Sequence, residues 1–107
     1  MHRPAALTPK PTTIVDAPRL AKRLGIDLFI ASETFQETGS FKFRAAANVA
    51  ANVSNPVLLA ASSGNFGQAL AHAAALAGKK AIIVMPSRSA KMKIDAVRDF
   101  GGEVVFV

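Results

Sequence analysis

The sequence predicts an α/β fold built on a doubly wound parallel β-sheet. The main evidence is a repeat of apolar, strand-like runs that begin near residues 56, 80 and 103, so that successive starts lie 24 and 23 residues apart. This is the spacing of strand–helix units. The segments between these runs are alanine-rich or amphipathic and end in glycine, as helices commonly do. Half of the 107 residues are hydrophobic, which is enough for an ordinary buried core.

The first half of the chain is expected to hold two helices and one strand. In order, we expect an extended, proline-rich lead-in at 7–13, a short helix at 16–25, a strand at 27–33 and a helix at 41–52. Asp16 and Ser40 have side chains that are preferred at helix N-caps. Gly25 stands where the first helix should stop.

The second half continues with alternating strands and helices. We expect strands at 57–61, 80–85 and 103–107, a helix that ends near 77, and a helix capped by Ser89 and ended by Gly101 and Gly102. Because residues 57–61 are apolar throughout, that strand is expected to be covered on both faces. The last strand reaches Val107 without a turn or polar tail. We therefore expect the chain to be the opening piece of a longer protein.

Composition and charge exclude several classes of function. The absence of cysteine excludes disulfide scaffolds, thiolate zinc sites, iron–sulfur clusters and cysteine nucleophiles. The formal charge of +6 favours an anionic partner, but the basic residues are scattered and neither tyrosine nor tryptophan is present for base stacking. An ordinary basic surface is favoured over nucleic-acid binding. No apolar run suits a signal peptide or a membrane span, so we expect a cytoplasmic protein without membrane contact.

Lys42 falls in the first turn of a predicted helix, where a lysine is unexpected. The helix dipole there repels cations and favours Asp or Glu. It also disfavours the ammonium form, which pushes the amine toward the neutral, nucleophilic state that condensation with an aldehyde needs. Spacing alone leaves open a plainer interpretation, an exposed and solvated lysine. Arg44, two positions on, is expected to face elsewhere on the helix.

The segment Ser62–Gly67 follows a buried strand and opens a helix. Its backbone N–H groups, its hydroxyls and the Asn65 amide can bind an anion. The sequence has neither the Lys-Ser/Thr of a Walker A loop nor the G-x-G-x-x-G of a dinucleotide site. A tight turn with Ser63 as the helix cap explains the pattern equally well.

The other polar candidates favour structural roles. His72 is alone in a predicted helix, without a partner at metal-ligand spacing, and is expected to pack rather than to bind a metal. Asp95 and Asp99 are spaced i, i+4 like a carboxylate pair, but Lys91 and Lys93 on the same helix favour solvated ion pairs.

Both loops are similar to motifs of one enzyme family. Glu33–Ala46, ETFQETGSFKFRAA, resembles the cofactor-lysine segment of the fold type II pyridoxal-phosphate enzymes, and Ser62–Ala69, SSGNFGQA, resembles their asparagine loop. The closest branch is the serine/threonine dehydratase and serine racemase group, and the likeness covers nearly the whole chain. It implies pyridoxal 5′-phosphate as cofactor and an incomplete N-terminal portion of the tryptophan synthase β-like fold. Residues 1–52 would belong to the large cofactor domain, and 53–107 would begin the small one.

The resemblance also implies roles for individual residues. Lys42 corresponds to the lysine that binds the cofactor covalently and transfers protons, Phe41 to the residue beside the pyridine ring, and Asn65 to the one that bonds the ring 3-hydroxyl. Ser63 matches the acid/base of the opposite face in racemases. The residues that would hold the substrate carboxylate are Ser62, Ser63, Gly64, Asn65 and Phe66. The implied reaction converts a β-hydroxy amino acid such as L-serine or L-threonine to a 2-oxo acid and ammonia.

Three features depart from the family pattern. Phe66 replaces the usual His, and Ala46 replaces a common Gly. The glycine-rich phosphate loop and the residue that faces the pyridine nitrogen are expected beyond Val107. We therefore expect this chain alone to bind the cofactor weakly and turn over little, and the full-length protein to be an enzyme and a homo-oligomer.

Other functions stay open at this stage. Ser63 leaves serine racemase activity as an alternative. An inactive fragment or interaction module that retains the motifs is a second alternative, and a basic nucleotide- or nucleic-acid-binding α/β domain is a third. Cysteine synthase is disfavoured, because Phe-Lys-Phe-Arg-Ala lacks the Asp that this branch usually places before the Arg.

Overall fold

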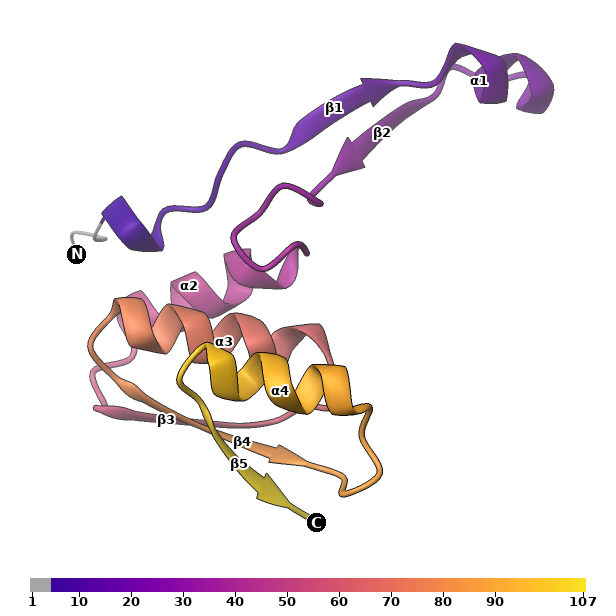
Figure 1. Cartoon of the computed structure of the whole chain (residues 1–107). Coiled ribbons are helices and arrows are strands. Elements are labelled where there is room, and N and C mark those ends of the chain that lie inside the picture. The colour runs from indigo at the N-terminus through magenta and orange to yellow at the C-terminus, as the bar shows by residue number, and fades with distance from the viewer. Residues whose placement is uncertain (1–4) are drawn as a thin grey trace.

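A computed structural model describes residues 5–107 and shows a projecting arm attached to a helix-covered sheet (Figure 1). The elements are, in chain order, η1 Ala5–Leu7, β1 Thr13–Asp16, α1 Pro18–Leu24, β2 Phe29–Ser32, α2 Lys42–Asn52, β3 Val57–Ala61, α3 Asn65–Leu76, β4 Lys80–Met85, α4 Lys91–Asp99 and β5 Glu103–Phe106. The radius of gyration is 16.3 Å, compared with roughly 13 Å for a compact domain of this length. The projecting arm accounts for the difference.

A three-stranded parallel sheet with the order β3–β4–β5 forms the base of the molecule. Its register pairs Leu58 with Ala81 and Ile83 with Val104. Helices α3 and α4 connect consecutive strands, and Figure 1 shows both on the same face of the sheet. Right-handed crossovers between strands added in one direction produce this arrangement. The predicted α/β class and the parallel sheet are confirmed.

The two faces of the sheet differ in burial. The side chains buried beneath the helices are those of Leu58, Ala81, Ile83 and Met85. On the opposite face Val57 is 44% exposed and Leu59 is 69% exposed. The expectation that residues 57–61 are covered on both faces is therefore wrong within residues 5–107. A continuous apolar run cannot reveal whether its second face has a cover.

Helix α2 packs on α3 and forms a layer above the sheet helices (Figure 1). The contact is made mainly of alanines, with Phe43 fully buried among them. Small side chains let two helices approach closely. Leu7, in η1, is buried on the same pair of helices, so one core joins the lead-in, α2, α3 and the sheet. The division at residues 52 and 53 stays a prediction, and its first segment begins outside the described residues.

The arm consists of strands β1 and β2 with α1 between them. The strands pair antiparallel, with Thr13 opposite Ser32 and Asp16 opposite Phe29. Strand β1 was not expected, and Asp16 ends it instead of capping α1, whose N-cap is Ala17. The stop at Gly25 is confirmed: the residue has a left-handed φ of 67°, a conformation that glycine adopts without strain.

The starts of α2 and α4 test two further cap predictions. Ser40 Oγ accepts a 3.4 Å hydrogen bond from the backbone N–H of Lys42, although the N-cap position itself is Phe41. Ser89 is not the cap of α4, because this helix follows Ala90 and Ser89 Oγ is buried without a hydrogen-bond partner. The predicted end at Gly101, with φ of 88°, is confirmed.

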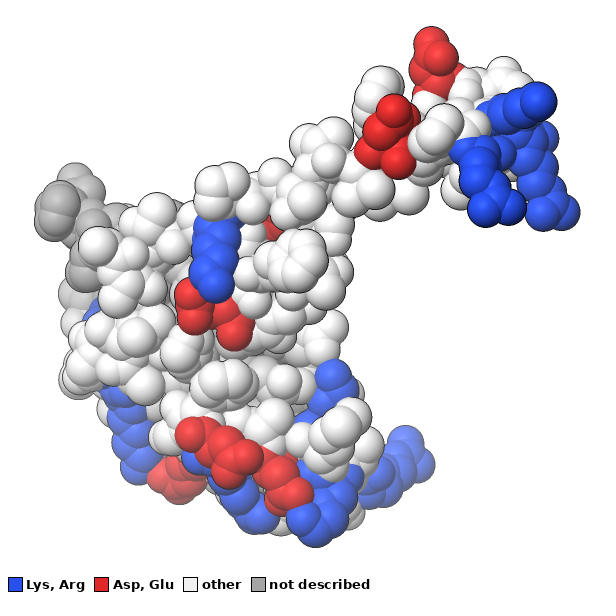
Figure 2. Space-filling model, turned by 45° about the horizontal axis from the view of Figure 1, so that its top comes forward, with Lys and Arg blue, Asp and Glu red and all other residues white. Residues whose placement is uncertain are grey.

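The basic residues fall into separate groups. Figure 2 shows one group at the tip of the arm, where α1 carries Arg19, Lys22 and Arg23, and others on the body with acidic side chains among them. The face in view therefore has no continuous basic surface, in agreement with the scatter seen in the sequence. No helix within residues 5–107 has both the length and the apolar character needed to cross a bilayer.

Candidate active site

The predicted site residues come from the N-terminal ends of α2 and α3. These helices run in the same direction, and both begin at the edge of the sheet where β3 and β4 finish (Figure 1). Ligands bind at this edge of parallel α/β sheets, because the loops that follow the strands meet the helix N-termini there. The fold therefore brings Lys42, the first residue of α2, and Asn65, the first residue of α3, to the same edge.

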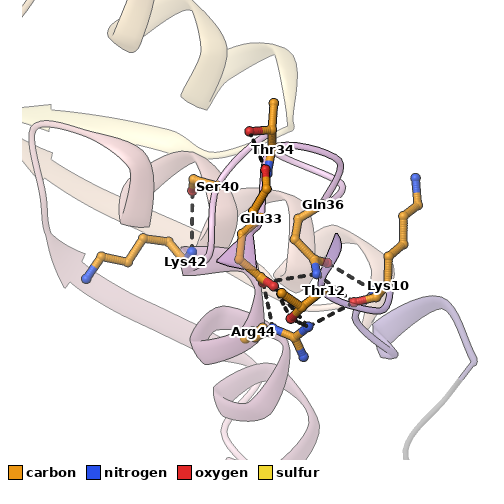
Figure 3. Close-up of polar contacts among 9 residues, drawn as sticks. Lys10, Thr12, Glu33, Thr34, Gln36, Ser40, Lys42 and Arg44 are labelled. Carbon is orange, nitrogen blue, oxygen red and sulfur yellow. Dashed lines mark hydrogen bonds and ion pairs between the residues drawn. The ribbon is translucent and has the colours of Figure 1, made fainter. Parts of the chain in front are cut away.

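The amine of Lys42 has no polar partner among the described residues. Its Nζ lies 4.8 Å from the centroid of the Phe41 ring, a cation–π contact that leaves the donors of the amine unused. Figure 3 shows the side chain extending away from the polar cluster around Arg44. Lys42 is half-buried, so the amine is neither paired nor enclosed.

Arg44 fixes the start of α2 to the lead-in segment. Its Nε donates to Glu33 Oε2 at 2.6 Å, and its Nη2 donates to the Lys10 carbonyl at 3.0 Å and to Thr12 Oγ1 at 2.8 Å. The Gln36 amide, which is 5% exposed, bonds both the N–H and the carbonyl of Lys10. Figure 3 shows these side chains converging on one point. As expected, Arg44 does not face Lys42.

This cluster changes the titration of its carboxylate. The hydrogen bond from Arg44, supported by those from Thr12 and Gln36, holds the pKa of Glu33 below its usual value of 4.5. Glu33 in turn raises the pKa of Arg44. The ion pair is therefore complete at neutral pH and weakens only under acid conditions.

The loop between β3 and α3 leaves backbone donors free. Ser62 Oγ accepts hydrogen bonds from the N–H groups of Gly64 at 3.3 Å and Gly67 at 3.0 Å. The N–H groups of Asn65 and Phe66, in the first turn of α3, have no acceptor among the described residues, and no side chain caps the helix. Uncapped N–H groups at a helix N-terminus favour an anion.

Gly64 and Gly67 have different surroundings in this loop. A Cβ at Gly67 would lie 3.0 Å from Cγ2 of the buried Ile83, so this glycine lets α3 approach the sheet. A Cβ at Gly64 would meet nothing within 4 Å. The loop is therefore held against the sheet at Gly67 and open at Gly64.

Ser63 and Asn65 have different neighbours. Ser63 is exposed and lines a pocket of about 320 Å³ with the loop that precedes α4, including Arg88 and Ser89. Its hydroxyl makes no hydrogen bond within residues 5–107, and it does not cap α3, whose N-cap is Gly64. Asn65 Oδ1 accepts a 2.8 Å hydrogen bond from Lys93 Nζ.

The structure brings the candidate residues to one edge without linking them directly. No hydrogen bond or ion pair in the described part of the chain joins Lys42 to residues 62–66. The Phe41 ring is 59% exposed beside Lys42, whereas Phe66 is half-buried against the core. A separate pocket of about 540 Å³ beside α1 in the arm contains none of these residues.

His72 and Asp95 have the structural roles expected of them. His72 packs between the rings of Phe43 and Phe100, at centroid distances of 5.8 and 4.9 Å. Asp95 pairs with Lys91 on the exposed side of α4. Residues 5–107 contain no group of three or more side chains suited to hold a metal ion.

The chain matches one family of known proteins over all its described residues. The sequence model of one family, described as pyridoxal-phosphate dependent enzyme, matches residues 5–107. The chain belongs to this family. Pyridoxal phosphate is the cofactor in the family's description, which confirms the cofactor predicted from the two loops.

Relatives within the pyridoxal-phosphate dependent enzyme family agree with the predicted branch. The biosynthetic L-threonine dehydratase IlvA of Pasteurella multocida is 42% identical over 98 residues, which cover 88% of this chain and 19% of that protein. Processed threonine deaminase isoform 2 of Solanum lycopersicum superposes with a TM-score of 0.84 at 37% identity, over 92% of this chain and 28% of that one. Maize serine racemase superposes with a TM-score of 0.83 at 31% identity, over 89% of this chain and 30% of that one. The chain thus spans from about a fifth to less than a third of the length of these relatives.

The residues at the sheet edge fit the family's cofactor. An aldehyde requires an amine, and the Nζ of Lys42 is unpaired. The pyridine ring of the cofactor packs favourably on an apolar side chain, and the exposed ring of Phe41 lies beside that amine. Polar groups of a ligand require donors, which the N–H groups of Asn65 and Phe66 supply, and the open space at Gly64 lets a ligand approach the backbone.

Two contacts at the site were not anticipated from the sequence. Arg44 and Glu33 are 11 residues apart, and Lys93 and Asn65 are 28 residues apart. Neither spacing produces a local signal, because helix-surface pairs meet only at three or four residues. Lys93 was expected to be an ion-pair partner on the surface of α4; it bonds Asn65 because the start of α4 lies beside the start of α3.

Proposed function

We propose that this chain contributes the cofactor lysine and the asparagine loop of a pyridoxal-phosphate-dependent ammonia-lyase. The reaction would be the deamination of a β-hydroxy amino acid such as L-serine or L-threonine to a 2-oxo acid and ammonia. The observation that carries the proposal is the unpaired amine of Lys42 at the same sheet edge as the uncapped N-terminus of α3. The threonine dehydratases among the relatives support the choice of reaction.

The bound cofactor would supply an electron sink for the negative charge that develops when the α-proton leaves. Lys42 would hold the cofactor covalently until the amino group of the substrate replaces its amine. The released Nζ, which has no competing hydrogen bond in residues 5–107, would then take up that proton. The Phe41 ring would cover one side of the pyridine ring. The Arg44–Glu33 pair would keep the first turn of α2, and hence Lys42, fixed against the lead-in.

The loop Ser62, Ser63, Gly64, Asn65 and Phe66 would bind the substrate carboxylate. Its free N–H groups point along the axis of α3, where the helix dipole favours an anion. Within this loop the hydroxyl of Ser62 would hold the backbone in shape, because it already accepts two backbone N–H groups. The Asn65 side chain would donate to the oxygen on the cofactor ring.

Racemisation of serine is a second candidate function, favoured by the exposed and unpaired hydroxyl of Ser63. Serine racemases from maize and Dictyostelium discoideum are among the structures that resemble this chain. Chiral chromatography after incubation with L-serine and the cofactor measures this activity. If the wild type forms D-serine and Ser63→Ala forms only the 2-oxo acid, racemisation is supported. If the wild type forms no D-serine, elimination is the only reaction of the two.

The proposal extends to the wider protein. We infer that residues 1–52 belong to a cofactor domain and 53–107 to a smaller α/β domain, and that the active protein is a cytoplasmic homo-oligomer that binds neither nucleic acid nor membranes. The exposed apolar side chains of β3 and of the arm support further association. For this chain alone we expect weak cofactor binding, since its sequence has no glycine-rich phosphate loop.

Reduction with borohydride in the presence of pyridoxal 5′-phosphate tests the proposal. Peptide mass spectrometry then locates the fixed pyridoxyl group among the seven lysines. We expect most of it on Lys42, with loss in Lys42→Arg and no change in the matched control Lys22→Arg. An even distribution over all lysines would contradict the proposal, and strongly salt-dependent binding of an oligonucleotide would favour a nucleic-acid-binding domain instead.

A further inference from the structure

A residue outside the predicted site holds the side-chain amide of Asn65. Lys93, on α4, donates from Nζ to Asn65 Oδ1 at 2.8 Å. A lysine ammonium has three donors and no acceptor, so the amide atom that faces it must be the oxygen. The orientation of the Asn65 amide is therefore determined by Lys93.

The other end of the same amide is free. Asn65 Nδ2 makes no hydrogen bond within residues 5–107, so both of its N–H groups are available at the sheet edge. An asparagine that rotates freely offers either an acceptor or a donor to a ligand. An ammonium at the oxygen keeps the amide from turning round, so the N–H groups stay on the side away from Lys93.

We propose that Lys93 is a positioning residue that makes Asn65 a hydrogen-bond donor and so favours a cofactor ring that carries an accepting oxygen. The inference rests on the proposed function, in which Asn65 faces that oxygen. Lys93 does not need to touch the cofactor for this role. A full positive charge behind the amide also strengthens the N–H groups as donors, as in other charge-assisted chains of hydrogen bonds.

The neighbouring Lys91 provides a matched control. It lies on the same helix and carries the same charge, but its side chain is 87% exposed and pairs with Asp95. Substitution of either lysine by methionine removes one positive charge from α4. Only the change at Lys93 removes the contact with Asn65.

Amide orientation can be measured without the cofactor. In the ¹⁵N-labelled full chain we expect the side-chain NH₂ signals of Asn65 to shift in Lys93→Met, to stay unchanged in Lys91→Met, and to return toward their original position in Lys93→Arg. The backbone signals report in the same spectra whether each variant is folded. Unchanged Asn65 side-chain signals in a folded Lys93→Met chain would overturn the inference.

Selectivity for the ring oxygen is measured by titration with pyridoxal 5′-phosphate and with its 3-deoxy analogue. The ratio of the two dissociation constants is expected to fall by about 3- to 10-fold in Lys93→Met, the range that the net loss of one ordinary hydrogen bond produces. The ratio should change less than about twofold in Lys91→Met and in Lys93→Arg. The intrinsic effect of the oxygen on aldehyde chemistry is common to all variants and cancels in the comparison.

The two outcomes that contradict these proposals are distinct. Suppose that the wild-type chain binds pyridoxal 5′-phosphate at Lys42 but the ratio of the two dissociation constants is unchanged in Lys93→Met. This result overturns the role of Lys93 and leaves the proposed function intact. Absence of binding at Lys42 in the wild-type chain overturns the proposed function and, with it, the selectivity inferred here.

Discussion

Phe41 and Phe43 flank Lys42 in the sequence, but their rings have opposite environments. Phe43 is fully buried beside His72, whereas Phe41 is 59% exposed. Burial of a phenylalanine ring removes about 200 Å² from water, which is worth about 5 kcal/mol at 25 cal/mol per Å². Phe43→Ala is therefore expected to lower the free energy of unfolding by about 3–5 kcal/mol. Phe41→Ala should lower it by at most about 1–2 kcal/mol, because less than half of its surface is covered.

Urea unfolding followed by far-ultraviolet circular dichroism compares the two variants. With an m value of about 1.5 kcal/mol per M, a difference of about 2 kcal/mol separates the midpoints by about 1.3 M. We expect the lower midpoint for Phe43→Ala. Equal midpoints, or a lower one for Phe41→Ala, would mean that α2 turns its other face to α3, and the direction assigned to the Lys42 side chain would then be wrong.

Two further predictions concern packing and pH. A Cβ at Gly102 would lie 2.8 Å from Val97 Cγ1 and 2.9 Å from Ala71 Cβ, so Gly102→Ala should destabilise the fold by about 1–3 kcal/mol. Thermal unfolding compares Gly102→Ala with the control Gly64→Ala, whose added Cβ meets nothing within 4 Å. Equal melting temperatures of the two variants would refute the close contact at Gly102. The hydrogen bond from Arg44 lowers the pKa of Glu33 below 4.5 in the folded state. The ionised Glu33 side chain therefore stabilises the fold fully above about pH 4.5, and this stabilisation is lost as the pH falls through the lower pKa of the folded state. Hydrogen exchange between about pH 6 and pH 3 should show the lead-in loosening only at the acid end in the wild type and at every pH in Glu33→Gln. A variant as protected as the wild type at neutral pH would show that the pair does not anchor the lead-in.

Elements with a strong local signal were predictable from the sequence. The strand at 80–85 and the first-turn position of Lys42 are as expected, because an apolar run and a run of alanines specify them locally. Strand β1 was missed, since its pairing with β2 is made across α1 and leaves no local pattern. The exposed face of β3 was missed for a related reason: the sequence of a strand reports its own polarity and not what covers it.

The site was predictable in its residues but not in its supports. The asparagine loop and the lysine segment carry short motifs. Both fall at the same sheet edge, because α3 begins there after β3 and α2 packs on α3 in the same direction (Figure 1). The contacts of Lys93 with Asn65 and of Arg44 with Glu33 depend on how distant elements pack, which no single segment encodes. Ser89 shows the opposite case. Its side chain is typical of a helix cap, but α4 begins after Ala90 and the Ser89 hydroxyl bonds no backbone N–H.

The central claim is that Lys42 and the loop of residues 62–66 form one cofactor site. It is tested most directly by fixing a pyridoxyl group on Lys42 of the ¹⁵N-labelled chain with borohydride and comparing backbone amide shifts with those of the unmodified chain. We expect the largest changes outside α2 at Gly64, Asn65 and Phe66. Changes confined to the residues next to Lys42, with the loop signals unmoved, would show that the amine and the loop do not share a ligand.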